Sequence, residues 1–503
     1  MYNASKEVAV GPRAADLVAM GAASAAGSYA TVFGAPVGDV GTWAREVWAA
    51  RWGRIVESLE LAFRTDQEAA VRAAHLIRGP GASAAHWLRC APATDPHILE
   101  VLRSADDAWA RLWRFFGGGS RAGAADPALV ARVFGGGPAC LGHSSAVQAA
   151  DSLYRRGVSE AWPFLATWSI AAGIPWRDFA AALTDVPSGQ LGPAATVRTV
   201  GAHLAAAAAA SEEALAVARA AAGAAVAAAP GPGAKCTPAA AAAGTPNFWV
   251  ASLGAGGGPG GGRIAAAGGP GASLVVARIL GLPVWPALGV PRFSHCRRCL
   301  APSALRAEPG PPGRHTRGAT ATRALDDFGQ HALVCPKGGI RAGGKRRHDE
   351  CARGLAAVSA MSGSGGRYHD GPVFTWGPKT RPADFMDKEG SPQHPEGRCV
   401  DFTCGLRERG LPTERELAKV AKYRAQMAAH PHLSFAPFGA DLCGELGPSA
   451  GGILASWART MGAARALAGI PAGNTYGEVM VAACRVITRA LTDQMVQWAS
   501  PIA

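Results

Sequence analysis

Residues 230–272 divide this chain into two parts of different character. Pro-Gly and Gly-Gly runs, such as Gly254–Gly262, interrupt alanine tracts in this segment. Such a composition cannot bury enough side-chain surface to offset the conformational entropy that is lost on folding, so we expect a flexible linker. A chain of 503 residues is also too long for one compact core, so two or three domains are expected.

The part before the linker, residues 1–229, has the pattern of a helical region. Between residues 43 and 116, large hydrophobic side chains recur at three- and four-residue spacing with few glycine or proline breaks. Leu204–Ala229 is mostly alanine with three charged residues, which predicts a helix in water rather than a membrane span. The first 13 residues lack the apolar core of a secretory signal. We therefore expect no membrane role.

The chain is basic, with 50 Lys and Arg against 37 Asp and Glu and a formal charge of +13. Much of the excess lies between Arg292 and Arg347, where we count twelve basic residues and three acids. Such a stripe favours binding to a nucleic-acid backbone, whereas the alternative is a solvated charged loop. A short nuclear import signal is a further interpretation of its last three basic residues. The candidate contacts in this stripe are Arg297, Arg298, Lys345, Arg346 and Arg347, followed by His348.

Two pairs of potential metal ligands lie within the same basic stretch. Cys296-x2-Cys299 is followed, after 31 residues, by His331-x3-Cys335. Three thiolates and one imidazole are a complete tetrahedral set for Zn²⁺, so the zinc would be structural and would leave no open position for water. A redox-active CxxC pair is the alternative, but it does not explain the His-x3-Cys arm. Eleven cysteines are too few for a disulfide scaffold, so a reducing compartment is expected.

Two aspartates further along the chain are candidates for a catalytic metal site. Asp384 begins an extended segment, and Arg398–Cys404 alternates so that Asp401 faces one side and Phe402 the other. The two carboxylates could then meet across neighbouring strands and hold Mg²⁺, which polarises a phosphodiester and lowers the pKa of bound water. The alternative interpretation is that these acids are solvated side chains on a hairpin.

A helix with two lysines follows these strands. Pro412 and the capping box Thr413-x-x-Glu416 predict its start, and Lys419, Lys422 and Tyr423 then lie within about one turn of each other. A lysine that reaches back from this helix could orient the attacking water and offset charge on a scissile phosphate.

The order of these motifs resembles the C-terminal part of non-LTR retrotransposon polyproteins, which carry a CCHC zinc knuckle and a restriction-like endonuclease of the PD-(D/E)XK type. The resemblance implies that Asp384 and Asp401 bind the metal and that Lys419 or Lys422 is the catalytic lysine. It also implies that Arg381 and Tyr423 contact nucleic acid. Thr403 stands where many nucleases of this superfamily have lysine.

The resemblance predicts an α+β multidomain protein and a Mg²⁺-dependent endonuclease that nicks target DNA for target-primed reverse transcription in the nucleus. No Tyr-x-Asp-Asp motif occurs, so a polymerase supplied in trans and element RNA are expected partners beside DNA. The alternative is a catalytically dead nucleic-acid-binding remnant. The expected units are a post-palm helical region in residues 1–229, the linker 230–272, a zinc knuckle in 286–348 and a nuclease domain with a small mixed sheet in 349–503.

Overall fold

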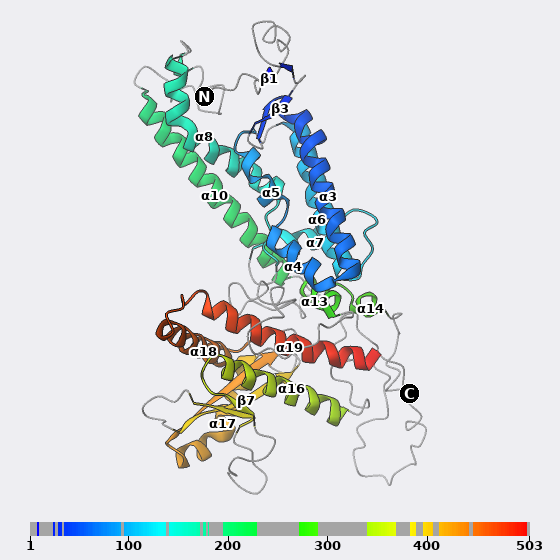
Figure 1. Cartoon of the computed structure of the whole chain (residues 1–503), viewed down its shortest axis with the longest axis vertical. Helices are drawn as coiled ribbons and strands as arrows, with labels where there is room; N and C mark the ends of the chain where they lie inside the picture. Colours follow the sequence, from blue (N-terminus) through cyan, green and yellow to red (C-terminus); the bar gives the residue numbers. More distant parts are fainter. Residues whose placement is uncertain are drawn as a thin grey trace.

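The structure is a computed structural model, and its overall arrangement is drawn in Figure 1. The predicted zinc ligands Cys296, Cys299, His331 and Cys335 lie outside the residues that it describes, as do Arg297, Arg298, Arg381 and nearly all of the predicted linker. The described residues are 8–9, 24–25, 29–32, 35–91, 95–136, 140–171, 175–177, 180, 195–228, 271–289, 340–368, 383–388, 396–405, 412–441 and 446–499.

The N-terminal part is helical, as the sequence predicts, with two small pairs of strands at its start. Aspartate side chains at positions 39, 66, 95 and 126 accept hydrogen bonds from the first backbone N–H groups of four helices. These groups have no partner within a helix, which is why aspartate favours the position before the first turn. The elements are β1 (Val8–Ala9), β2 (Ser24–Ala25), β3 (Tyr29–Val32), β4 (Ala35–Gly38), α2 (Val40–Trp43), the π-helical η2 (Ala44–Trp48), α3 (Ala49–Thr65), α4 (Gln67–Ile77), α5 (Pro80–Leu88), α6 (Pro96–Phe116), α7 (Pro127–Phe134), α8 (Ala146–Ala171) and α10 (Val197–Ala228).

Tryptophan side chains fill the core of this helical part. The rings of Trp48 and Trp52 stack with their centroids 6.1 Å apart, and Trp52 contacts Trp109 of α6 at 5.2 Å. All three are buried. The four-residue spacing of Trp48 and Trp52 places both on one face of η2 and α3, and this face packs against α6. The long alanine-rich helix α10 lies along α8 (Figure 1).

The C-terminal part is a four-stranded mixed sheet between helices. The sheet order is β5-β6-β7-β8, in which β7 and β8 are parallel and the other pairs are antiparallel. A parallel pair needs a crossover connection, and a helix supplies it here between β7 and β8. The elements are α16 (Ile340–Met361), β5 (Arg367–Tyr368), β6 (Phe385–Asp387), β7 (Gly397–Gly405), α17 (Pro412–Ala429), β8 (Leu433–Asp441), α18 (Pro448–Leu467) and α19 (Thr475–Ala499).

Helices cover both faces of the sheet. Asp401 of β7 contacts Lys419 of α17, whereas the neighbouring Phe402 contacts His348 of α16. Successive side chains of a strand point to opposite faces, so α17 lies on one face and α16 on the other. Phe438 of β8 stacks on Trp457, which places α18 on the same face as α16, and α19 packs on both of these helices. The strand β7 is therefore buried on both sides.

Two helices join the N-terminal and C-terminal parts. α13 (Gly271–Ile279) contacts both α6 and α19, and it lies with α14 (Val284–Ala287) between the two parts in Figure 1. Buried residues of both parts form one continuous hydrophobic core. The structure therefore shows an α+β protein that is mostly helical, with a small mixed sheet. None of the described helices is long and apolar enough to cross a membrane.

One predicted boundary differs from the structure. The sequence places a domain boundary after residue 348, whereas α16 runs without a break from Ile340 to Met361. Contacts on one side of α16 explain why the helix continues past residue 348. His348, Cys351 and Leu355 lie on this side, which faces the sheet. The basic triplet Lys345–Arg347 is thus part of the first helix of the sheet domain.

Candidate active site and metal centre

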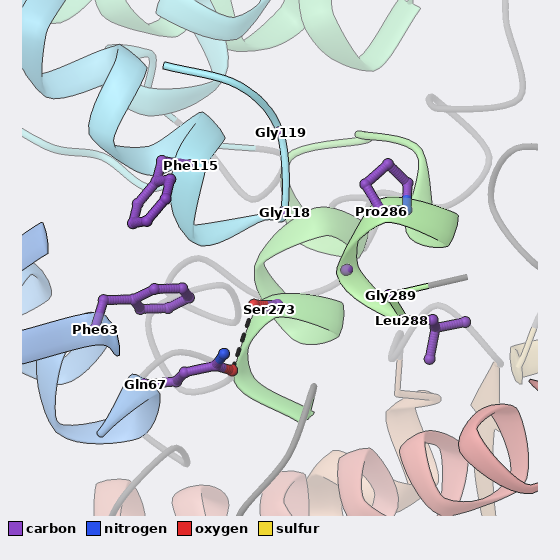
Figure 2. Close-up of a pocket in the computed structure, with 10 residues that line it drawn as sticks. Phe63, Gln67, Phe115, Gly118, Gly119, Ser273, Pro286, Leu288 and Gly289 are labelled. Carbon is purple, nitrogen blue, oxygen red and sulfur yellow. Dashed lines mark hydrogen bonds between the residues drawn. The ribbon is translucent and has the colours of Figure 1, made fainter. Parts of the chain in front are cut away.

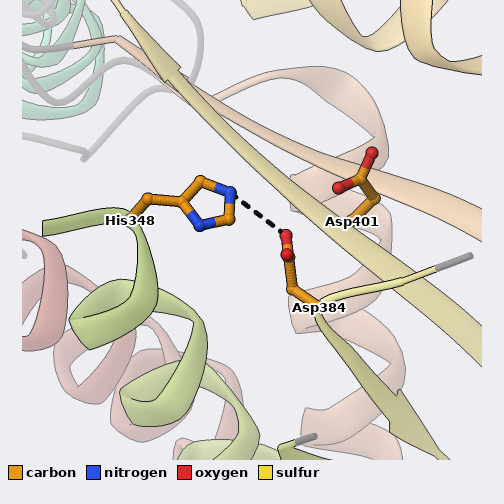
Figure 3. A group of neighbouring side chains, drawn as sticks. All are labelled: His348, Asp384 and Asp401. Atoms are coloured by element: carbon orange, nitrogen blue, oxygen red, sulfur yellow. Dashed lines mark ion pairs between the residues drawn. The ribbon is translucent and has the colours of Figure 1, made fainter. Parts of the chain in front are cut away.

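The pairing of β6 with β7 brings the two predicted aspartates together. Asp384 directly precedes β6, and its backbone N–H donates to the carbonyl oxygen of Val400 at 3.0 Å. Its carboxylate Oδ2 in turn accepts a 2.7 Å hydrogen bond from the backbone N–H of Phe402. Asp401 lies between these two partners on β7, so the strand pairing itself holds the two carboxylates side by side (Figure 3).

A histidine from α16 completes the cluster. Nε2 of His348 lies 3.2 Å from Oδ2 of Asp384 and 3.0 Å from the carbonyl oxygen of Phe402. One nitrogen or oxygen atom from each of His348, Asp384 and Asp401 lies within 4.8 Å of the others. Within the described part of the chain, this is the group of His, Cys, Asp and Glu side chains that could hold a metal ion.

The two predicted lysines lie in different places. Nζ of Lys419 forms an ion pair with Oδ2 of Asp401 at 2.6 Å, and its side chain is 26% exposed. Nζ of Lys422 instead donates to the hydroxyl of Tyr423 at 3.1 Å and lies over the Tyr423 ring. The helix α17 therefore brings Lys419 into contact with Asp401, whereas Lys422 contacts Tyr423.

The pKa values of the two carboxylates are shifted in opposite directions. Burial raises the pKa of Asp401 to about 6, the negative charge of Asp384 adds to the increase, and Lys419 opposes it. Burial also acts to raise the pKa of Asp384, but hydrogen bonds and the charge of His348 lower it overall. Two like charges in a buried site disfavour simultaneous ionisation, so the pair behaves as one coupled unit.

The two cationic groups of the site remain protonated at neutral pH. Burial acts to lower the pKa of Lys419, but the charge and hydrogen bond of Asp401 raise it above its usual value. Burial likewise acts to lower the pKa of His348, whereas the hydrogen bond and charge of Asp384 raise it to about 9. Lys419 is therefore an ammonium donor rather than a general base.

Glu416 does not have the role that the capping box predicts. Its carboxylate is buried, and it accepts hydrogen bonds from the backbone N–H groups of Gly439, Ser449 and Ala450 at 2.9 to 3.0 Å. The last two belong to the first turn of α18, whose N–H groups have no partner within the helix. Glu416 thus joins α17 to β8 and α18, one turn before Lys419. Burial raises the pKa of Glu416, and the three N–H donors offset part of this increase.

Several residues that the sequence predicts to contact nucleic acid contact other side chains of the protein instead. The side chain of Tyr423, which the sequence predicts to contact nucleic acid, is buried against Phe435, with ring centroids 5.2 Å apart. Arg347 is partly buried and donates to Gln494 of α19. Lys345 and Arg346 are exposed, and Arg346 pairs with Glu350 one turn along the helix. His348 belongs to the carboxylate cluster, which sequence reasoning missed.

A helical pattern in the sequence could have identified the position of His348. Ala352 and Leu355 follow it at four and seven residues, and both are fully buried. Side chains at this spacing share one face of a helix. The glycines and basic residues just before His348 favour a loop interpretation, and this hid the pattern.

A separate pocket lies where α13 and α14 meet the N-terminal helices. It has a volume of about 480 Å³, and Phe63 and Phe115 form one side of it (Figure 2). On another side, the hydroxyl of Ser273 donates to the side-chain oxygen of Gln67 at 3.4 Å. None of the described residues that line it is titratable, so it offers no group for acid–base chemistry or metal binding.

Comparisons with known proteins return no relative. No protein-family model, no curated protein and no solved structure matches this chain significantly. The retrotransposon resemblance therefore rests on the sequence motifs alone.

Proposed function

We propose that this chain is a Mg²⁺-dependent endonuclease that nicks DNA. One observation carries the proposal: Asp384 just before β6, Asp401 of β7 and Lys419 of α17 converge where the two central strands of the small mixed sheet pair. Two adjacent carboxylates with a lysine beside them form a site that can bind a divalent cation and stabilise a phosphate in hydrolysis.

The donor set fits a hard divalent cation. Both aspartates supply carboxylate oxygens, which are the ligands that Mg²⁺ prefers, with water and phosphate oxygens filling the remaining positions. The raised pKa of Asp401 reflects burial first and then the negative charge of Asp384 beside it. A bound cation would offset this repulsion between the two carboxylates. When bound, Mg²⁺ would polarise the scissile phosphate and lower the pKa of a bound water.

Lys419 supplies a positive charge beside the scissile phosphate. The attacking water oxygen loses a proton to solvent and forms a bond to phosphorus, the bond from phosphorus to the 3′ oxygen breaks, and the 3′ oxygen takes up a proton from solvent. The products are a 3′-hydroxyl and a 5′-phosphate. Negative charge grows on the phosphate oxygens in this step, and an ammonium group held at 2.6 Å from Asp401 is positioned to offset it.

Exposed basic residues on α16 supply the contact to the DNA backbone in this proposal. Lys345 and Arg346 are exposed within the first half of the helix that carries His348 into the site. Phosphate contacts of this kind position the duplex without reading its sequence. We further propose, from the resemblance, that the chain derives from a non-LTR retrotransposon and acts in the nucleus with a zinc knuckle, element RNA and a polymerase in trans.

Nicking of supercoiled plasmid by the full chain tests the proposal. With Mg²⁺ we expect open circles whose nicks carry 3′-hydroxyl ends that a DNA polymerase extends, and we expect no product in EDTA. Lys345→Ala together with Arg346→Ala should weaken DNA binding and reduce its salt dependence. Salt-sensitive DNA binding without any nicking would instead favour the catalytically dead remnant and contradict the endonuclease.

A further inference from the structure

His348 can relate to a cation at Asp384 and Asp401 in two ways. It can bind the ion directly through a ring nitrogen, or it can hold one of the carboxylates that bind the ion. The two roles predict different metal chemistry, because imidazole ligands suit Zn²⁺ and other transition metals, whereas carboxylate and water ligands suit Mg²⁺.

The hydrogen bonds around His348 favour the second role. Nε2 faces two acceptors, the carbonyl oxygen of Phe402 at 3.0 Å and Oδ2 of Asp384 at 3.2 Å. A nitrogen that faces two oxygen acceptors carries a proton and has no lone pair to offer an ion. Ligation through Nε2 would therefore break both contacts, and the other ring nitrogen, Nδ1, lies 3.4 Å from Oδ1 of Asp349.

Asp384 is held from two sides through the same oxygen. Its Oδ2 accepts from the backbone N–H of Phe402 at 2.7 Å as well as from His348. The backbone of Phe402 thus contacts both residues. Its N–H donates to Asp384, and its carbonyl oxygen lies beside Nε2 of His348. The ring of Phe402 also contacts the imidazole, with centroids 5.6 Å apart. These contacts fix the position of Oδ2, and with it the orientation of the Asp384 carboxylate beside Asp401.

We infer that His348 is a positioning residue that orients the Asp384 carboxylate from outside the metal's coordination sphere. The inference rests on the proposed function, since it assumes that Asp384 and Asp401 hold the ion. Figure 3 shows the arrangement, in which Asp384 lies between His348 and Asp401. The protein ligands of the ion are then oxygen atoms only, which explains why the site suits Mg²⁺ although a histidine lies beside it.

Mn²⁺ binding to the full chain tests this inference, because Mn²⁺ is paramagnetic and also accepts oxygen ligands. His348→Ala should weaken Mn²⁺ binding by about tenfold to a hundredfold, as loss of such supporting hydrogen bonds does. His348→Gln places an amide donor near the position of Nε2 and should restore most of the affinity. His432→Ala, which changes an exposed histidine, should leave the affinity unchanged.

Pulsed electron paramagnetic resonance of the bound Mn²⁺ separates the two roles. We expect no coupling to a directly coordinated imidazole nitrogen in the wild-type chain. A directly coordinated nitrogen signal that disappears in His348→Gln would overturn the inference.

A metal-free measurement separates failure of this inference from failure of the proposed function. A wild-type chain that binds no Mn²⁺ would contradict the proposed function. Independently, the melting temperatures of His348→Ala, Asp384→Ala and the double variant in EDTA report whether the two side chains interact. We expect the second substitution to lower the melting temperature much less when the first is already present. Fully additive shifts in melting temperature would contradict the inference that His348 positions Asp384 through a hydrogen bond.

Discussion

Nζ of Lys419 lies 2.6 Å from Oδ2 of Asp401, although the two residues belong to different elements. The parallel pairing of β7 with β8 explains this contact, because the chain must cross the sheet between two parallel strands. The crossover helix α17 therefore lies over the face of β7 from which Asp401 projects. Glu416 fixes this helix through three backbone N–H groups. In the proposed nuclease, this arrangement supplies the lysine that Thr403 does not.

The two lysines of α17 should differ in their effect on nicking. Lys419→Met removes the ammonium beside Asp401 and should lower the single-turnover nicking rate by about a hundredfold to a thousandfold. Lys422→Met is the matched control, because Lys422 contacts Tyr423 instead. It should change the rate by less than about threefold beyond any effect on DNA affinity. Equal losses in both variants would contradict the assignment of Lys419.

Affinity for the divalent cation should depend on pH through the coupled aspartates. Burial and then the charge of Asp384 raise the pKa of Asp401 to about 6, so below this pH a cation must displace a proton. Mn²⁺ affinity should fall about tenfold for each pH unit below about 6 and level off above about 7. Because Lys419 lowers the pKa of Asp401, Lys419→Met should move this dependence to higher pH. An affinity that is flat between pH 5 and 7 would contradict the coupling.

Glu416 should contribute strongly to stability. Glu416→Ala leaves three backbone N–H groups without an acceptor at a buried position and should lower the free energy of unfolding by about 3 kcal/mol. Urea denaturation of the full chain measures this change. The control Glu396→Ala removes an exposed glutamate, 4.0 Å from His432, and should cost less than about 1 kcal/mol. Similar losses in both variants would show that Glu416 does not join α17 to α18.

The zinc site stays a prediction from the sequence, and metal content tests it. The full chain, purified without added zinc, should retain about one tightly bound zinc per chain, as the four-ligand pattern predicts. Cys335→Ala should lose it, whereas Cys351→Ala should keep it, because Cys351 is buried in α16 outside the motif. Zinc content that does not change in Cys335→Ala would exclude the predicted knuckle.

Local patterns in the sequence predict the helical N-terminal part, the strand that carries Asp401 and the helix that carries Lys419. Each depends on side-chain periodicity or on a start signal within a few residues. The same reasoning assigns Glu416 to a local capping box. The backbone N–H groups that it actually binds belong to residues 23 or more positions away. Long-range partners of this kind leave no mark in the nearby sequence.

The positions of His348 and Tyr423 show the same limit. Tyr423 looks available on a basic helix, but packing on Phe435 of β8 buries it. His348 follows a basic stretch that looks like a loop, which hides its helical spacing to the buried Ala352 and Leu355, and the contact with Phe402 shows that it faces the sheet. Residue type and spacing thus identify the two acids, while the three-dimensional packing decides which neighbours support them.

Nicking by the full chain and its carboxylate variants tests whether Asp384 and Asp401 hold the metal ion that cleaves DNA. Supercoiled plasmid is incubated with wild type, Asp384→Asn, Asp401→Asn and the control Asp493→Asn, in Mg²⁺ and in EDTA, with DNA binding measured in parallel. We expect Mg²⁺-dependent nicking by the wild type and Asp493→Asn and a loss of about a thousandfold or more in the other two, with DNA binding retained. Nicking that persists in Asp384→Asn and Asp401→Asn would show that these carboxylates do not catalyse it.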